Sequence, residues 1–309
     1  MILKPVVIGI LLLASSTLSY ANATLGVSQF FVPSQLIGGA LPPVKNDSFS
    51  VRTGFPLNYS ENLSYSTGPI IDTSGNPVAQ GHASTSVSYD LSKGEFKLYT
   101  DSLLPSAGPT VGGLASHATI SLADYLTVHS PTASPASPTF LTLRLESQGT
   151  LSSLKETDPL SKGYFDSHLR ARNEAIPGLV ADGSVRTTCI FGAENAGCGS
   201  DDHIGFLGGS FGTASGGIAD GGQDEITLRI PLYQETSRVQ LSMNLNSNSV
   251  QSITDFSHTT RLFIDIPGGS FTSESGITSA SVVPEPETYA MLLAGFGLIS
   301  TMIRRRKAL

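Results

Sequence analysis

The stretch Val239-Gln240-Leu241-Ser242-Met243-Asn244-Leu245-Asn246 alternates apolar and polar side chains without a break. Successive side chains of a β-strand point to opposite faces, so this period of two predicts a strand with one buried and one wet face. The same alternation recurs at 87–91, 141–145, 226–232 and 262–266, and a longer or bulged version at 118–128. Seven or more such strands predict an all-β chain, an antiparallel β-sandwich of jelly-roll-like form.

Short polar segments separate these strands. Ser92-Lys93-Gly94 follows the strand at 87–91 and leads into Phe96 and Leu98, which predicts a hairpin. Three prolines in 130–138 predict a loop, and the Gly-, Ser- and Ala-rich segment 208–222 predicts a long surface loop. The segment 163–176 fits neither the strand nor the helix period and stays unassigned.

The N-terminus reads as a signal peptide over residues 1–23. Lys4 precedes an apolar run at 6–14, and Ala21-Asn22-Ala23 fits the small-x-small rule for cleavage before Thr24. This predicts export through the Sec machinery. The alternative is a retained N-terminal transmembrane helix, for which the apolar run is short.

The C-terminus, residues 284–309, combines three features. Pro284-Glu285-Pro286 precedes an uncharged apolar run at 288–303, and four cations follow it: Arg304, Arg305, Arg306 and Lys307. As a helix, the run is about 24 Å long, slightly short for a hydrocarbon core of about 30 Å. Cations beside an apolar run favour the cytoplasmic side, so the preceding chain is expected outside the inner membrane. The alternative is a buried C-terminal helix with a solvated basic end.

This order of Pro-Glu-Pro, short apolar helix and Arg-rich end resembles the PEP-CTERM sorting signal of Gram-negative bacteria. The resemblance covers less than a tenth of the chain. It implies recognition by an exosortase, a membrane protease that removes the helix and releases the protein or attaches it to the surface. It also implies an association with exopolysaccharide and with biofilm or floc formation.

Between the two ends lies the passenger domain, residues 24–283, which is long enough for one large β domain or two small ones. It carries 13 cations and 23 acids, a net formal charge of −10. This acidity argues against nucleic acid and anionic membrane surfaces as partners, and it is compatible with cations or neutral glycans. The absence of Trp weakens a sugar-stacking hypothesis, although nine Tyr and fourteen Phe remain.

Two cysteines, Cys189 and Cys198, are the only ones in the chain. An even number of cysteines in an exported protein favours a disulfide. A metal site with His203 as third ligand is the alternative. The spacing excludes a CxxC redox motif.

Carboxylates on Gly-rich segments are the candidate calcium ligands. These are Asp220, Asp224 and Glu225, with Asp201-Asp202-His203 as a second group. Calcium takes several oxygen ligands on a bending backbone, but neither group has EF-hand spacing. Asp and Gly are also common in turns and at the starts of strands without any metal, so no cofactor is expected.

Catalytic patterns are poor. Gly208-Gly209-Ser210-Phe211-Gly212 fits G-x-S-x-G, but the Gly- and Ser-rich sequence after it does not favour the helix that a nucleophile elbow requires. His203, His258 and Asp220 have no spacing that recommends them as partners of Ser210. No pair of acids can be chosen for glycoside hydrolysis. The sequence predicts a flexible loop here rather than a hydrolase.

One basic neighbourhood stands out in the passenger domain. One interpretation is a surface for an acidic polysaccharide, but acids at 158, 166 and 174 favour an ordinary solvated face. Its members are Lys155, Lys162, His168, Arg170 and Arg172.

Together these patterns and the resemblance predict a non-enzymatic exported protein of the envelope or extracellular matrix, a structural or adhesive component associated with exopolysaccharide and biofilm. Its tail would anchor it transiently in the inner membrane before the protein reaches the surface or the medium. A secreted carbohydrate- or calcium-binding module is the first alternative, and a secreted hydrolase is the second.

Overall fold

The computed structural model describes most of the passenger domain. The described ranges are 23–33, 44–50, 56–66, 70–71, 77–103, 114–154, 161–191, 197–207, 212–215 and 223–278. The predicted signal peptide up to residue 22 and the predicted sorting signal at 284–309 lie outside these ranges.

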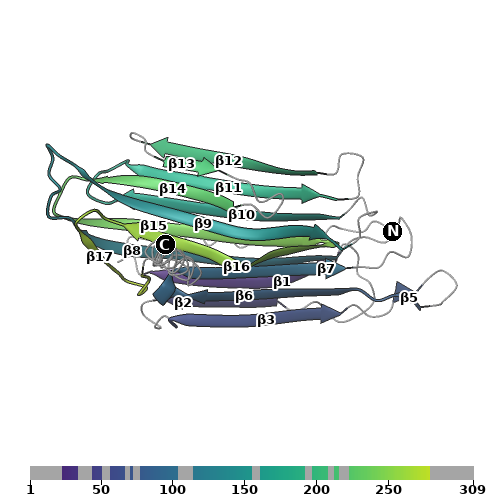
Figure 1. Ribbon diagram of the computed structural model, residues 1–309. Helices are drawn as coiled ribbons and strands as arrows, with labels where there is room; N and C mark the ends of the chain where they lie inside the picture. Colours follow the sequence, from purple (N-terminus) through teal and green to yellow (C-terminus); the bar gives the residue numbers. More distant parts are fainter. Residues whose placement is uncertain are drawn as a thin grey trace, which may run out of the picture.

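One sheet has eight strands in the order β12-β11-β10-β15-β8-β1-β2, with β17 also paired to β8 (Figure 1). We call it the first sheet. Its strands are β1 (Thr24–Pro33), β2 (Val44–Ser50), β8 (Leu114–His129), β10 (Lys162–Asn173), β11 (Val180–Ile190), β12 (Gly197–Leu207), β15 (Thr236–Val250) and β17 (Ser270–Ser273).

The second sheet has seven strands in the order β13-β14-β9-β16-β7-β6-β3. They are β3 (Asn58–Ser66), β6 (His82–Asp90), β7 (Glu95–Leu103), β9 (Thr139–Ser153), β13 (Gly212–Ser215), β14 (Gln223–Leu232) and β16 (Ser252–Asp265). A separate pair joins β4 (Ile70–Ile71) to β5 (Pro77–Ala79), and η1 (Leu91–Lys93) is a 3₁₀ turn between β6 and β7.

The core lies between the two sheets. The apolar residues of the opening stretch, Leu241, Met243 and Leu245, are buried, and the polar residues between them face outward. Inward side chains of β9, β14 and β16 join them in one cluster. All strand pairs named above are antiparallel, so the predicted all-β, antiparallel class is confirmed.

The unassigned segment 163–176 is largely a strand, β10. Its inward residues alternate with outward ones, but they include Gly163, Ser167 and Asn173 beside Phe165 and Leu169. Because small or polar residues occupy several of the inward positions, the apolar residues of β10 do not recur at every second position, and the sequence does not show the strand period. The neighbouring strands β11 and β15 pair with β10 along its length and determine the conformation.

Of the two predicted loops, one is confirmed and one is partly wrong. The segment 130–138 is a turn-rich connection that contains only an isolated bridge between Ser134 and Ser137. Within 208–222, however, Gly212–Ser215 forms β13 and pairs with β14. Backbone pairing to an existing sheet edge does not require the apolar residues on which a sequence-based strand assignment depends.

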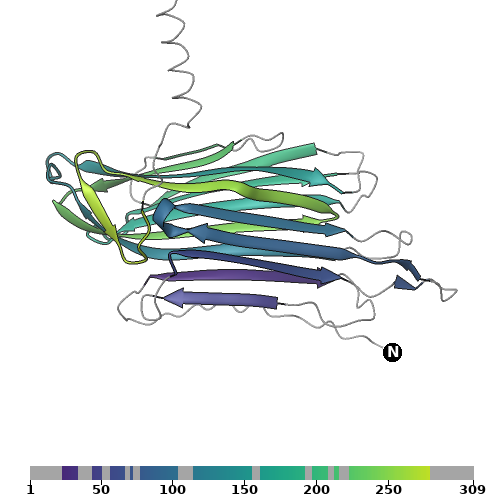
Figure 2. The ribbon, with the colours of Figure 1, turned by 60° about the horizontal axis from the view of Figure 1, so that its bottom comes forward.

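The sandwich has two ends. We call one the tail pole, because the last described residues lie there, and the other the corner pole, because the chain turns there from one sheet to the other. At the tail pole lie η1, the 130–138 connection and β17, which is yellow-green at one end of the strands in Figures 1 and 2. At the corner pole, β15 passes into β16 of the other sheet through Gln251, which has a φ of 54°. Strands of up to 16 residues, such as β8, separate the two poles by about 50 Å.

Candidate functional site

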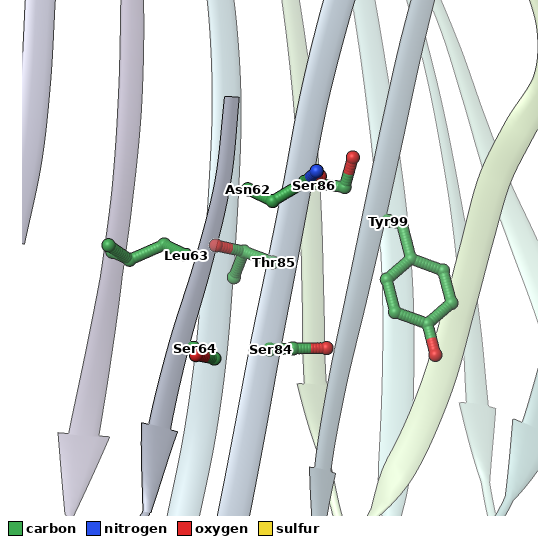
Figure 3. Close-up of a pocket in the computed structure, with 7 residues that line it drawn as sticks. All are labelled: Asn62, Leu63, Ser64, Ser84, Thr85, Ser86 and Tyr99. Carbon is green, nitrogen blue, oxygen red and sulfur yellow. The ribbon is translucent and has the colours of Figure 1, made fainter. Parts of the chain in front are cut away.

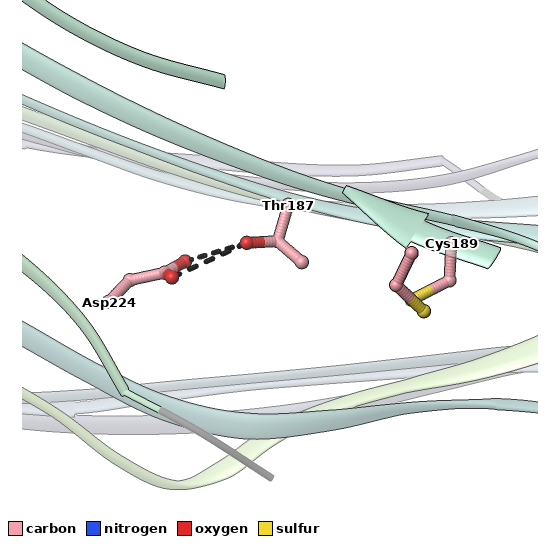
Figure 4. Close-up of a disulfide and its surroundings, with 4 residues drawn as sticks. Thr187, Cys189 and Asp224 are labelled. Atoms are coloured by element: carbon pink, nitrogen blue, oxygen red, sulfur yellow. Dashed lines mark hydrogen bonds between the residues drawn. A yellow bond between two sulfur atoms is a disulfide. The ribbon is translucent and has the colours of Figure 1, made fainter. Parts of the chain in front are cut away.

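The disulfide is confirmed. Cys189 of β11 and Cys198 of β12 lie directly opposite each other and are bonded (Figure 4). Cys189 is fully buried, whereas β12 is an edge strand whose pairing partner is β11. The bond therefore fastens the outermost strand of the first sheet near the corner pole.

The calcium candidates do not converge. Asp224 points into the sandwich, where Thr187 Oγ1 donates to its carboxylate at 3.1 and 3.3 Å (Figure 4). Glu225 follows it in β14 and faces outward, where it accepts from Thr227 Oγ1 at 2.9 Å. Asp220 lies outside the described residues. Within those residues, no three His, Cys, Asp or Glu side chains are grouped as metal ligands.

The second acidic group and the G-x-S-x-G candidate are not assembled into a site either. Asp201, Asp202 and His203 are exposed on the edge strand β12. Ser210 and Asp220 lie outside the residues that the structure describes. His258 belongs to β16, on the far side of β9 and β14 from the edge strand β13.

The basic neighbourhood becomes a mixed-charge surface. Lys162, His168, Arg170 and Arg172 share the outer face of β10, and Lys155 lies outside the described ranges. His168 Nε2 lies 2.5 Å from Asp182 Oδ1. On the same face, Arg186 donates to Asp166 Oδ2 at 3.0 Å, which raises the pKa of the guanidinium. Acids interleave the cations, as the solvated-face interpretation predicts.

Sequence reasoning missed a polar surface on the outer face of β3, β6 and β7, which we call the hydroxyl face. Ser60, Asn62 and Ser64 of β3 lie beside Ser84, Ser86 and Ser88 of β6. Tyr99 of β7 is paired with Ser86, and its ring borders a depression in this face (Figure 3). The strand register places the hydroxyl and amide groups in rows across the sheet.

Acidic groups hold Tyr99 in place. Its hydroxyl donates to Asp101 Oδ2 at 2.9 Å, and Asp101 Oδ1 accepts from the backbone N–H of Ser84 at 2.7 Å. Burial raises the pKa of Tyr99, and the hydrogen bond to Asp101 and the charge of Asp255 act in the same direction. Tyr99 is therefore a neutral donor with an oriented ring. The outward Ser and Asn residues of 58–66 and 82–90 were the sequence signal for this face.

Comparison with known proteins decides the nature of the tail. The model of the PEP-CTERM protein-sorting motif matches residues 282–307. The C-terminal segment of the chain carries a PEP-CTERM protein-sorting motif. No curated protein and no solved structure matches it.

The PEP-CTERM match contains the predicted motif Pro284-Glu285-Pro286 and the basic residues 304–307. Such a motif implies an exported protein and, in general, processing by an exosortase. Within the described ranges, the structure has no helix long and apolar enough to cross a membrane.

The structure describes the N-terminal boundary of the passenger domain from residue 23 onward. Ala21 lies outside the described residues, whereas Ala23 is fully buried and continues the inward face of β1. The first strand begins at Thr24, the residue that follows the predicted cleavage site. The cleavage itself stays a prediction.

Proposed function

We propose that this protein is a non-enzymatic component of the cell envelope or extracellular matrix that associates with exopolysaccharide. Its PEP-CTERM motif accounts for export and sorting. After removal of the signal peptide and the tail, the β-sandwich would be the working part, free or attached at the surface.

The observation that carries the association with polysaccharide is the hydroxyl face. The side chains of Ser60, Asn62, Ser64, Ser86 and Ser88 have no hydrogen bond to other described parts of the chain. They are exposed or half-buried, so water satisfies them. A sugar polymer offers hydroxyl groups at similar density and can replace that water without leaving polar groups unpaired.

Tyr99 adds an aromatic surface to these polar groups. Aromatic rings present an apolar face and, in Tyr, a polar edge, which suits a ligand that has both C–H and O–H groups. Because Asp101 fixes the Tyr99 hydroxyl, the ring loses little freedom on binding.

The charge of this face favours a neutral glycan. Asp101 follows Tyr99 on the same face of β7, Asp255 of β16 is paired with Tyr99, and Lys97 precedes Tyr99 on that face of β7. Carboxylates repel an anionic polymer at short range. On the mixed-charge surface of β10 and β11, by contrast, His168 is paired with Asp182 and Arg186 with Asp166.

A released carbohydrate-binding module is the second candidate, and the same face supports it. The two functions differ in the final location of the protein, which is the matrix in the first case and the medium in the second. Asp224 and Glu225 face opposite sides of β14, so these two calcium candidates do not share a site.

Retention of the protein by isolated exopolysaccharide tests the proposal. Tyr99→Ala and Asn62→Ala are expected to lower retention at least tenfold, and Tyr99→Phe less, because it keeps the ring. Tyr164→Ala, on the outer face of the first sheet, is the matched control. Equal retention of Tyr99→Ala and wild type, or wild-type biofilm strength in a strain that lacks the gene, would overturn the proposal.

A further inference from the structure

The last described residues of the passenger domain cross the tail pole from one sheet to the other. Strand β17 pairs with β8 on the same side as β1, with Ser273 opposite Leu126 and Thr24 opposite Ala123. Strands β17 and β1 therefore lie end to end along β8. The chain must turn away after β17, because the start of β1 occupies the next positions.

Asp124 is the residue at this turning point. Its carboxylate is fully buried and accepts three hydrogen bonds from the departing chain: from Ser273 Oγ at 2.6 Å, Ser275 Oγ at 2.7 Å and Ser275 N at 3.1 Å. A fourth comes from the N–H of Tyr125 at 2.7 Å. Hydrogen bonds to a carboxylate are stronger than neutral ones, so this contact fixes the chain firmly.

The chain is fastened again on the second sheet. Ile277 is buried, and its N–H donates to Ser273 Oγ at 3.0 Å. The N–H of Thr278 donates to Leu91 O in η1 at 3.0 Å, and the Thr278 hydroxyl donates to Ser92 O. We call residues 273–278 the strap, since they tie β8 to the turn between β6 and β7.

The strap ends close to the sorting motif. Pro284 is six residues beyond Thr278, and a fully extended chain spans at most about 3.6 Å per residue. The motif therefore lies within about 22 Å of the tail pole, against a sandwich about 50 Å long. Without the contacts to Asp124 and Leu91, residues 274–278 would add about 18 Å to that reach.

We infer that the strap is a positioning device for tail processing, with Asp124 as its positioning residue. It fixes the point at which the sorting tail leaves the folded domain and limits how far the motif can extend toward the membrane protease. This inference rests on the proposed sorting. Five residues, 279–283, then separate the strap from the sorting motif.

A shortened linker and its rescue test the strap in the full chain, in cells that process the wild type. Deletion of residues 279–281 leaves Pro284 within about 11 Å of Thr278 and is expected to reduce the processed fraction at least tenfold. Adding Asp124→Ala together with Thr278→Pro, which removes the donors of both Thr278 contacts, should release the strap, lengthen the reach and restore processing to within about twofold of wild type. Intact mass of the exported protein reports the fraction.

Asp224→Ala, combined with the same deletion, is the matched control, because it removes a buried carboxylate far from the strap. It should not restore processing. Normal processing of the deletion variant, failure of the strap release to rescue it, or equal rescue by Asp224→Ala would each overturn the strap. An unprocessed wild type would instead contradict the proposed sorting.

Discussion

Gly149 is the position where the packing of the second sheet leaves no room for a side chain. A Cβ atom at residue 149 would lie 2.5 Å from the carbonyl oxygen of Asp255 and 2.7 Å from the ring of Phe256. Ordinary contacts at such atoms are about 3.4–4 Å, so Gly149→Ala must move the β16 backbone by roughly 1 Å. That shift also disturbs Phe256, whose ring stacks on Phe165 with centroids 3.5 Å apart.

Overpacking of this kind costs about 1–3 kcal/mol, and loss of an aromatic pair adds about 1 kcal/mol. We therefore expect Gly149→Ala to lower the free energy of unfolding by about 3 kcal/mol. Urea titration followed by far-ultraviolet circular dichroism measures it. The matched control is Gly199→Ala on β12, where an added Cβ meets nothing within 4 Å. It should change stability by less than about 1 kcal/mol. Equal midpoints for the two variants would refute the packing argument.

Two further predictions concern the disulfide and pH. Replacing both Cys189 and Cys198 with Ala should lower the free energy of unfolding by about 2.7 kcal/mol, which is the loop entropy for a closed loop of about ten residues. Reduction of the disulfide in the wild type should lower it by the same amount. Identical urea midpoints would contradict it. Burial lowers the pKa of His117 to about 4, against an ordinary 6.5. Between these pH values, His117 is protonated in the unfolded chain but neutral in the folded protein. The free energy of unfolding should therefore fall by about 3 kcal/mol as the pH drops from 7 to 4. His117→Gln should flatten that part of the pH profile, and an unchanged slope would exclude His117 as its source.

The sequence predicts the sheet strands well where the inward face is uniformly apolar. Strand β15 carries Val239, Leu241, Met243 and Leu245 on that face, and the alternation is unmistakable. Strand β10 is not predicted from the sequence because Gly163, Ser167 and Asn173 occupy inward positions. Strand β13 is not predicted because its pairing with the edge of the sheet is a backbone interaction. Which strands become neighbours depends on long-range pairing that no local pattern encodes.

The same distinction applies to the functional residues. The sorting motif is contiguous in the sequence, and the chain has only two cysteines to pair. The sequence therefore suffices to predict both features. The hydroxyl face and the strap are not. Asp124 accepts a hydrogen bond from Ser275, 151 positions away. Tyr99 and Asn62 line the same depression only because of the register of β3, β6 and β7. Asp224 and Glu225 do not converge for a local reason: adjacent residues of a strand point to opposite faces.

The most direct test of the account is the intact mass of the protein recovered separately from the medium, outer membrane and inner membrane. The account predicts a mature species outside the inner membrane that lacks both the signal peptide and the apolar segment at 288–303. A single species that retains the tail and stays in the inner membrane would contradict the claim that the C-terminal signal is a temporary handle.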